Sequence, residues 1–191
     1  MRLRYKPKID KIVELLLYLA HTRPGADKYQ VVKFFYLADR EHLNRYGRPI
    51  TQEEYFALPY GPVASKAMDL VERDRWAMKE AGIDDLPFEV GQENRKGRTV
   101  TVLGVPLRDV NTDLFSKSDL RVFDEIIAKY GKCDFDELFK VTHDHQAYKK
   151  AWGRRKPNSK RAEMYYDEMI ESEDMRSAII EDFGGISQFI E

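Results

Sequence analysis

The chain has 191 residues, enough for one domain with a substantial hydrophobic core, or for one domain and an extension. Apolar residues make up 42% of it and charged residues 34%, a balance that excludes a disordered chain and a membrane-embedded one. The longest apolar run, near 12–20, contains Glu14 and falls short of the roughly 20 residues that a membrane span needs. The formal net charge of −1 provides no overall attraction to nucleic acid or to a membrane.

Two features predict a cytoplasmic location. The single cysteine, Cys133, cannot form an internal disulfide, which fits a reducing compartment. The basic residues at the start of the chain are not followed by the uncharged core and cleavage site of a secretion signal. We therefore expect a cytoplasmic protein.

The first half of the chain predicts three helices, defined by apolar residues at helical spacing, capping residues and Pro or Gly breaks. The first two helices are predicted over 8–22 and 28–46. The third is predicted to start at Pro62, because proline suits the first position of a helix. A short strand at 54–58 is predicted to precede it, with a turn at 60–62 between the two.

The second half is predicted to begin with a β-hairpin and to continue as helices. The hairpin strands are predicted at 88–90 and 99–105, joined by a polar loop at 91–98. Ser116 and Asp134 are predicted caps of the next two helices, and Gly131 is placed to end the first of them in a left-handed conformation. Further helices are predicted over 145–152, 162–171 and 174–183, with Gly184-Gly185 ending the last.

Together these elements predict a mostly α (α+β) fold, with about seven to eight helices and a small antiparallel β-hairpin or sheet. Each helix carries one apolar face, so the helices must pack on one another and on the hairpin.

Charge is unevenly distributed near the end of the chain. Seven basic residues and no acidic ones fall within 149–161, whereas nine acids and one base, Arg176, fall within 163–191. One interpretation is a solvated basic loop beside solvated acidic helices that attract it. The other is a basic strip that docks RNA or an acidic protein face.

Motifs for catalysis, metal binding or phosphate binding are not found. The glycines near 47, 61 and 82 are isolated, and no known zinc-site spacing occurs. His143 and His145 are two residues apart, which directs their side chains to different helix faces. Cys133 precedes a predicted cap and is expected to be a packed thiol. We therefore predict no enzyme activity, no cofactor and no metal.

Asp39 is the most notable acid, because it lies among apolar residues of the second helix. It could anchor Arg40, Arg45 or a backbone amide, or it could be functional. An enzyme hypothesis would place Asp39, Tyr55 and His143 around a pocket.

Eight aromatic residues fall between residues 29 and 60, more than one helix face can bury. Exposed aromatic side chains beside arginines are typical of protein-binding surfaces. The alternative is a large aromatic core shared by the first three helices.

A winged-helix DNA-binding protein is a further alternative, since three helices followed by a hairpin are among its elements. Its recognition helix would be 62–74, which carries three acids against two bases. A helix that faces phosphates should be net basic, so nucleic acid is not the partner that we expect.

Three segments in order, Tyr36–His42, Gly47–Ile50 and Tyr55–Val63, resemble the signature of the Panacea, or SocA-like, antitoxin domain. The second half of the chain adds further similarity, at Tyr130-Gly131, Leu138, Thr142-His143 and Ala151-Trp152. The resemblance covers about 9–152. It implies an antitoxin domain at 1–152 and a helical, acidic C-terminal extension at 153–191 that packs on it.

The resemblance implies a bacterial or phage-associated antitoxin of a type II toxin–antitoxin system, which neutralises a toxin encoded nearby by direct protein–protein binding. One branch of the family delivers its toxin to the ClpXP protease, so a proteolytic adaptor is an alternative. The domain itself is then not catalytic.

The signature positions are expected to define the fold, through turns, helix ends and polar anchors. They are Asp39, Gly47, Pro49, Ile50, Tyr55, Gly61, Pro62, Val63, Thr142, His143 and Trp152. We predict the partner-binding surface in 46–60, with Tyr46, Arg48 and Tyr60 as its anchors.

Overall fold

The computed structural model describes the backbone of residues 2–187 and the side chains of residues 2–182. Its helices are α1 (Ile9–Thr22), α2 (Lys28–Tyr46), α3 (Ser65–Val71), α4 (Arg75–Ala81), α5 (Lys117–Tyr130), α6 (Phe135–Asp144), α7 (Gln146–Gly153) and α8 (Glu173–Ser187). Its strands are β1 (Tyr55–Leu58), β2 (Gly61–Ala64), β3 (Phe88–Arg95), β4 (Arg98–Pro106) and β5 (Ala162–Glu163). The predicted fold class, mostly α with a small antiparallel β part, is confirmed.

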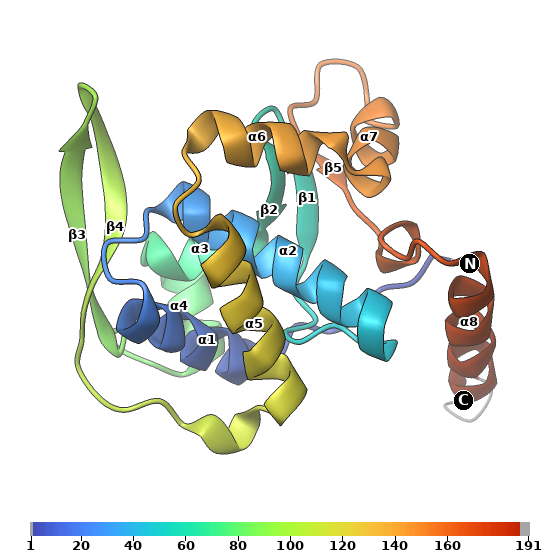
Figure 1. Cartoon of the computed structure of the whole chain (residues 1–191), viewed down its shortest axis with the longest axis horizontal. Coiled ribbons are helices and arrows are strands. Elements are labelled where there is room, and N and C mark those ends of the chain that lie inside the picture. The colour runs from blue at the N-terminus through green and yellow to red at the C-terminus, as the bar shows by residue number, and fades with distance from the viewer. Residues whose placement is uncertain (1, 188–191) are drawn as a thin grey trace.

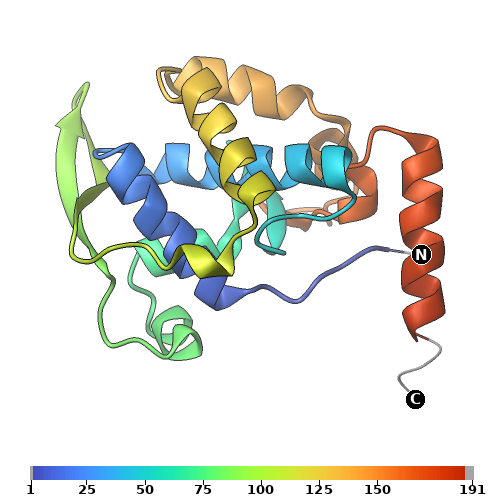
Figure 2. The same cartoon turned by 60° about the horizontal axis from the view of Figure 1, so that its bottom comes forward.

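The α2 helix crosses the middle of the molecule, as Figures 1 and 2 show. It packs against α3, α5, α6 and β2, and most of its side chains are buried. The expected capping box at its start is present, because Asp27 and Gln30 exchange side-chain and backbone hydrogen bonds. At its end Gly47 is left-handed, with φ +72°. The predicted bounds of this helix, 28–46, are confirmed.

The central sheet has the strand order β2-β1-β5, and both pairings are antiparallel. The predicted start of the third helix at Pro62 is wrong: residues 61–64 form β2, and α3 begins at Ser65. Pro62 fits there because β2 is an edge strand, so the N–H that proline lacks is not needed by a second neighbour. The chain turns at Pro59-Tyr60, directly between the paired strands.

The β3–β4 hairpin is longer than predicted. Residues 91–98 are not a loop, because β3 and β4 pair across this segment up to Arg95 and Arg98. The turn has two residues, Lys96 and Gly97, with φ +51° and +78°, a conformation that matches the twist of a hairpin. On its other side β4 bonds to the loop before α2, where Gly25 and Ala26 pair with Leu103.

The stretch between α3 and the hairpin contains a helix that the sequence analysis does not predict. The Asp74 carboxylate accepts hydrogen bonds from the amides of Trp76 and Ala77 and so caps α4. Gly82, with φ +66°, ends the helix. Seven residues are too few to show a clear apolar period, so the pattern gave little signal.

Three predictions in the second half are wrong. Residues 162–171 are not a helix, because Met164 donates to the Tyr55 carbonyl and extends the sheet; only a short 3-10 turn, Tyr166–Glu168, follows. Gly131 is right-handed, with φ −63°, and a side chain on it would lie 2.5 Å from the Ile127 carbonyl oxygen. Gly184-Gly185 does not end the last helix, since α8 continues to Ser187.

The segments near both ends of the described chain join one hydrophobic core. Leu3 pairs with the later segment, accepting from the Tyr166 amide at 3.2 Å and donating to Asp167 at 2.9 Å. Met164 and Ile170 are buried in the same core cluster. Within residues 2–187, no helix combines the length and apolar character that crossing a membrane requires.

Candidate functional site

Asp39 lies in the middle of a closed polar cluster. Its carboxylate is fully buried and accepts hydrogen bonds from the amides of Ile50 and Thr51, at 2.8 and 2.9 Å, and from the Thr51 hydroxyl at 2.6 Å. The hydroxyls of Tyr55 and Tyr166 donate to it at 3.0 and 3.3 Å. Burial raises the pKa of Asp39, while these donors oppose the rise. Of the sequence interpretations, the anchoring of backbone amides is confirmed.

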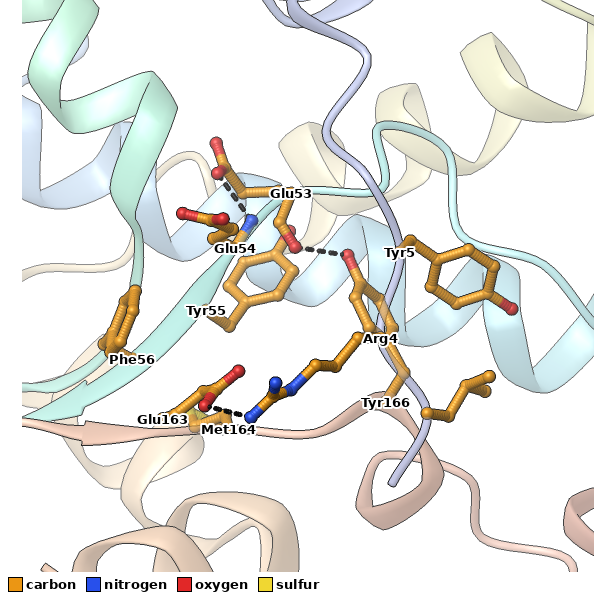
Figure 3. Close-up of a pocket in the computed structure, with 10 residues that line it drawn as sticks. Arg4, Tyr5, Glu53, Glu54, Tyr55, Phe56, Glu163, Met164 and Tyr166 are labelled. Carbon is orange, nitrogen blue, oxygen red and sulfur yellow. Dashed lines mark hydrogen bonds and ion pairs between the residues drawn. The ribbon is translucent and has the colours of Figure 1, made fainter. Parts of the chain in front are cut away.

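A small cavity lies next to this cluster, between β1, β5 and the start of the chain (Figure 3). Its volume is about 200 Å³, below the roughly 300–1,000 Å³ of typical ligand pockets. Glu53 lies against it, and the Glu53 carboxylate accepts from the amides of Lys66 and Ala67 at the start of α3. Burial raises the pKa of Glu53 to about 8, although these amides act in the opposite direction. The sequence analysis did not single out Glu53 as a helix cap, because it is twelve residues from Ser65.

Arg48 belongs to a second polar cluster, at the C-terminal end of α2. Its guanidinium donates to Asp119 at 2.8 Å and to Ser116 at 3.0 Å, at the start of α5. The buried Asp119 carboxylate also accepts a hydrogen bond from the Lys11 amine at 2.5 Å, and it lies 3.1 Å from Nε2 of His42. Burial would raise the pKa of Asp119, but the hydrogen bonds from His42 and Lys11 hold it well below its usual range. Asp119 of α5 therefore joins α1, through Lys11, to α2, through His42, and Arg48 ties the end of α2 to the start of α5.

Lys33, on the N-terminal half of α2, is buried, and no carboxylate among the side chains of residues 2–182 pairs with it. Its amine donates to the carbonyls of Tyr60 and Pro62, at 2.7 and 2.8 Å, and lies 4.7 Å from the Tyr29 ring centroid. Burial lowers the pKa of Lys33 to about 7. A neutral amine has two N–H groups, which match the two carbonyl acceptors. Lys33 thus holds the β1–β2 turn against α2.

Gly61 brings the two halves of the signature together. Its φ is +97°, and an added Cβ would lie 2.8 Å from Lys33 Nζ and 3.0 Å from both His143 and Thr142. A side chain at this position would be strained by the backbone and would also collide with its neighbours. The residues from the first and second halves of the signature therefore meet at this turn.

Exposed and half-buried aromatic side chains gather beside this turn. We call it the aromatic ridge, formed by Tyr29, Tyr60, Phe135, Phe139, His143 and Trp152. Tyr60 is 65% exposed and Phe135 42% exposed. Phe135, Phe139 and His143 follow one face of α6 at a spacing of four residues.

The ridge is held together by ring contacts. The Phe135 ring lies 4.5 Å from Tyr29 and 5.9 Å from Tyr60, centroid to centroid. Phe139 stacks on His143 at 3.6 Å, and the buried Tyr148 ring connects His143 to Trp152, at 4.4 and 6.1 Å. The result is a line of rings along α6 and α7.

His143 is a fixed member of the ridge. Its ring nitrogens lie 2.9 Å from the Phe139 carbonyl and 3.2 Å from the Pro59 carbonyl. Burial lowers the pKa of His143 below its ordinary value, although both carbonyls oppose this. A neutral ring donates to one carbonyl at a time, and either bond fixes the ring beside the β1–β2 turn.

The three predicted anchors do not form one patch. Tyr60 lies at the Lys33 end of α2, whereas Tyr46 is the last residue of that helix. Thirteen residues of helix separate Lys33 from Tyr46, which is about 20 Å along the axis. Tyr46 is 45% exposed and packs on His42, beside the Arg48 cluster.

The three residues of the enzyme hypothesis are also divided. Asp39 and Tyr55 share the closed cluster, whereas His143 lies in the ridge. Among residues 2–182, no group of three or more His, Cys, Asp or Glu side chains is arranged to hold a metal ion. Cys133 lies half-buried against the core, with its pKa raised by burial.

The remaining signature residues surround these clusters. Pro49, Ile50 and Val63 are buried next to the Asp39 carboxylate or in β2. Thr142 is buried and donates to the Leu138 carbonyl at 2.8 Å. A Cβ atom added to Gly47 would lie 3.9 Å from the Ile179 side chain of α8.

Comparison with protein families gives one match. The family described as antitoxin SocA-like, Panacea domain, matches residues 31–152, so this chain belongs to the SocA-like Panacea antitoxin family. The match spans both halves of the signature and the whole aromatic ridge except Tyr29. No curated protein and no solved structure matches the chain.

The sequence analysis missed Lys33 and the α6 rings as site residues. A lysine in an apolar segment (Val31–Leu37) was a signal for Lys33, because lysine is almost never fully buried without a special partner. The spacing of Phe135 and Phe139 predicted a core face, but it could not show that this face meets the exposed Tyr60.

Proposed function

We propose that this protein is the antitoxin of a type II toxin–antitoxin system, and that it neutralises a nearby-encoded toxin by binding it directly. Family membership supports the antitoxin role. The observation that carries the binding site is the aromatic ridge at the junction of the two signature halves, which is exposed at Tyr60 and Phe135. A domain that acts by occupying another protein needs a rigid surface of this kind and no catalytic pocket.

The ridge has the composition of a binding hot spot. Partly exposed Tyr and Trp side chains give a large contact area with little loss of side-chain freedom. Tyr60 is presented by a turn that Lys33 and Gly61 hold in place, so little order has to be gained on binding. An interface of about 1,600 Å² with a few such anchors can reach nanomolar affinity.

The proposal treats the domain as a regulator without catalytic activity. The small cavity in Figure 3 is lined by residues that hold the fold: Tyr166 donates to the Glu53 carbonyl at 2.8 Å, and Arg4 pairs with Glu163 at 2.7 Å. These side chains are engaged with one another, which supports a structural role for the cavity.

The test is co-expression with the protein of the adjacent open reading frame. We expect growth rescue and a complex that survives gel filtration. The double variant Tyr60→Ala/Phe135→Ala should fold normally but lose rescue. The control is Trp76→Ala, because Trp76 is 73% exposed on α4, at the end of the molecule away from α6 (Figure 2).

Two results would contradict the proposal. Absence of rescue and of a complex with the wild-type protein would remove the antitoxin role for this gene pair. A complex that tolerates the Tyr60/Phe135 double variant but is lost with Tyr46→Ala would move the interface to the other end of α2, where Tyr46 and Arg48 lie.

A second candidate is a proteolytic adaptor that delivers the toxin to ClpXP. It requires two separate binding surfaces, and the exposed Tyr46, at the other end of α2, offers an anchor away from the ridge. Toxin half-life in cells with and without the protease separates the two mechanisms. An unchanged half-life would leave sequestration alone.

A further inference from the structure

The end of α7 and the loop that follows it carry several cations that form no ion pair with a carboxylate in the described part of the chain. Of the seven basic residues in 149–161, Lys149 pairs with Asp144 and Arg154 pairs with Glu168. The other five form no ion pair with a carboxylate among the side chains of residues 2–182; they are Lys150, Arg155, Lys156, Lys160 and Arg161. Arg161 acts electrostatically on Asp69 without pairing with it. Within the described side chains, the ion pair of this segment with the acidic residues after it is that of Arg154 with Glu168.

Two of these arginines lie over aromatic rings. The Arg155 guanidinium lies 4.3 Å from the Trp152 centroid, and the Arg161 guanidinium lies 3.4 Å from the Phe56 centroid. Arg155 also donates from Nη1 to the Trp152 carbonyl at 2.9 Å, which fixes its position and leaves Nε and Nη2 as the groups for a bond to a carboxylate. Stacking also removes part of the conformational freedom that a surface arginine would lose on binding.

The backbone between the two arginines is itself ordered. Ser159 donates its amide to the Lys156 carbonyl at 3.0 Å, and its hydroxyl donates to the Arg161 carbonyl at 2.7 Å. Asn158 takes the left-handed conformation, with φ +65°, which closes the turn. The charges are therefore presented from a defined turn.

This basic turn, residues 150–161, continues the aromatic ridge. Trp152 belongs to both, because its ring stacks on Tyr148 and also contacts the Arg155 guanidinium. The opposite end of the ridge is acidic, since Asp134, Asp136 and Glu137 are exposed around Phe135. A polyanion such as RNA would be repelled at that end, whereas a protein surface can complement both charges.

We propose that the basic turn is the electrostatic docking surface for an acidic face of the toxin, which contacts the turn and the aromatic ridge together. This inference rests on the proposed function. The stacked Arg155 and Arg161 bind toxin carboxylates, and the unpaired lysines steer the encounter.

The experiment measures association and dissociation rates with the purified protein of the adjacent open reading frame, at 50 and 300 mM salt. The double variant Arg155→Glu/Arg161→Glu should lower the association rate at 50 mM salt about tenfold or more, and weaken its dependence on salt. The matched control is Lys117→Glu/Arg121→Glu, which changes the net charge equally on exposed α5 positions. It should stay within about twofold of the wild type.

A third variant, Arg155→Lys/Arg161→Lys, keeps the charge and removes the planar fork. The proposal expects a normal association rate and faster dissociation. Wild-type rates and salt dependence in the Glu variant would overturn the inference while leaving the antitoxin function intact. If the wild-type protein does not bind at all, both proposals fail. A 20-nucleotide single-stranded RNA is run in parallel: RNA binding that the Glu variant loses, with toxin binding unchanged, would make the turn a nucleic-acid surface and overturn the proposal.

Discussion

Polar side chains at the two ends of α2 are used in different ways. Towards the C-terminal end, the carboxylates of Asp39 and Asp119 are fully buried, and hydrogen-bond donors surround each of them. Towards the N-terminal end, the Lys33 amine holds a turn whose next side chain, Tyr60, is 65% exposed. The buried carboxylates join separate elements of the core, whereas the Lys33 amine fixes a turn that exposes the Tyr60 ring to solvent.

The comparison explains why one sequence signature contains residues with different roles. A buried carboxylate stabilises the fold only if it remains fully hydrogen-bonded, so its neighbours are constrained as a group. A presented ring requires only that its backbone be fixed, which Lys33 and Gly61 provide. Substitutions in the closed clusters should therefore change stability, and substitutions on the ridge should change binding.

The largest expected effect is at the closed cluster. Asp39→Ala leaves the donors of Ile50, Thr51 and Tyr55 buried without an acceptor and should lower the free energy of unfolding by about 3–5 kcal/mol. Urea denaturation measures it. Asp109→Ala is the control, because Asp109 is exposed, and it should stay within about 0.5 kcal/mol. A loss of unfolding free energy below about 1 kcal/mol for Asp39→Ala would contradict the stabilising role of the closed cluster.

The junction turn should be the next most sensitive position. Gly61→Ala combines a positive φ with an overlap against Lys33, and we expect a loss of about 2–4 kcal/mol in unfolding free energy. Gly97→Ala is the matched control: it also has positive φ but has no atom within 4 Å of the added Cβ. It should lose only about 1 kcal/mol. Equal losses of unfolding free energy at both glycines would show that Lys33, His143 and Thr142 can move aside for the added methyl group.

Lys33→Met should give a pH-dependent loss. Folding lowers the pKa of Lys33 to about 7 from its ordinary value of 10.5, so the unfolded chain binds the proton more tightly. The stability of the wild type should therefore rise, relative to Lys33→Met, as pH increases from 7 towards 10, and the difference should become constant below pH 7, where both states hold the proton. At pH 9 we expect a loss of about 1–3 kcal/mol, because two carbonyls lose their donor.

Thermal or urea unfolding from pH 6 to pH 10 measures this difference. Lys79→Met, at an exposed lysine of α4, is the control and should show no such pH dependence. A difference between wild type and Lys33→Met that is constant across this range would mean that Lys33 titrates normally in the folded protein.

The smallest effect on stability should come from the ridge. Tyr60→Ala removes an exposed ring, so unfolding free energy should change by less than about 0.5 kcal/mol. Under the proposed function, toxin affinity should nevertheless fall by about 1–2 kcal/mol. Calorimetry on the purified pair would show it. A Tyr60 variant that binds as tightly as the wild type would place the anchor elsewhere.

Much of the secondary structure followed from the sequence, for identifiable reasons. The α2 helix is long, carries a capping box and ends at a left-handed glycine, so its bounds were predictable. The α4 helix and the 162–171 segment were not, because the first is short and the second pairs with β1 instead of following its own periodicity. The family signature was recognisable because its residues lie close together along the chain.

The features of the candidate site also fall into those that the sequence predicts and those that depend on tertiary contacts. The sequence by itself determined the capped helices, the turn residues and the presence of an excess of aromatic side chains, because these depend on neighbours within a few positions. Only the tertiary structure decided that Tyr60 meets Phe135, that the buried Lys33 amine bonds to the Tyr60 carbonyl and that Arg48 is tied to Asp119. Each of these contacts joins residues 27 or more positions apart, and such pairs are set by how the helices pack.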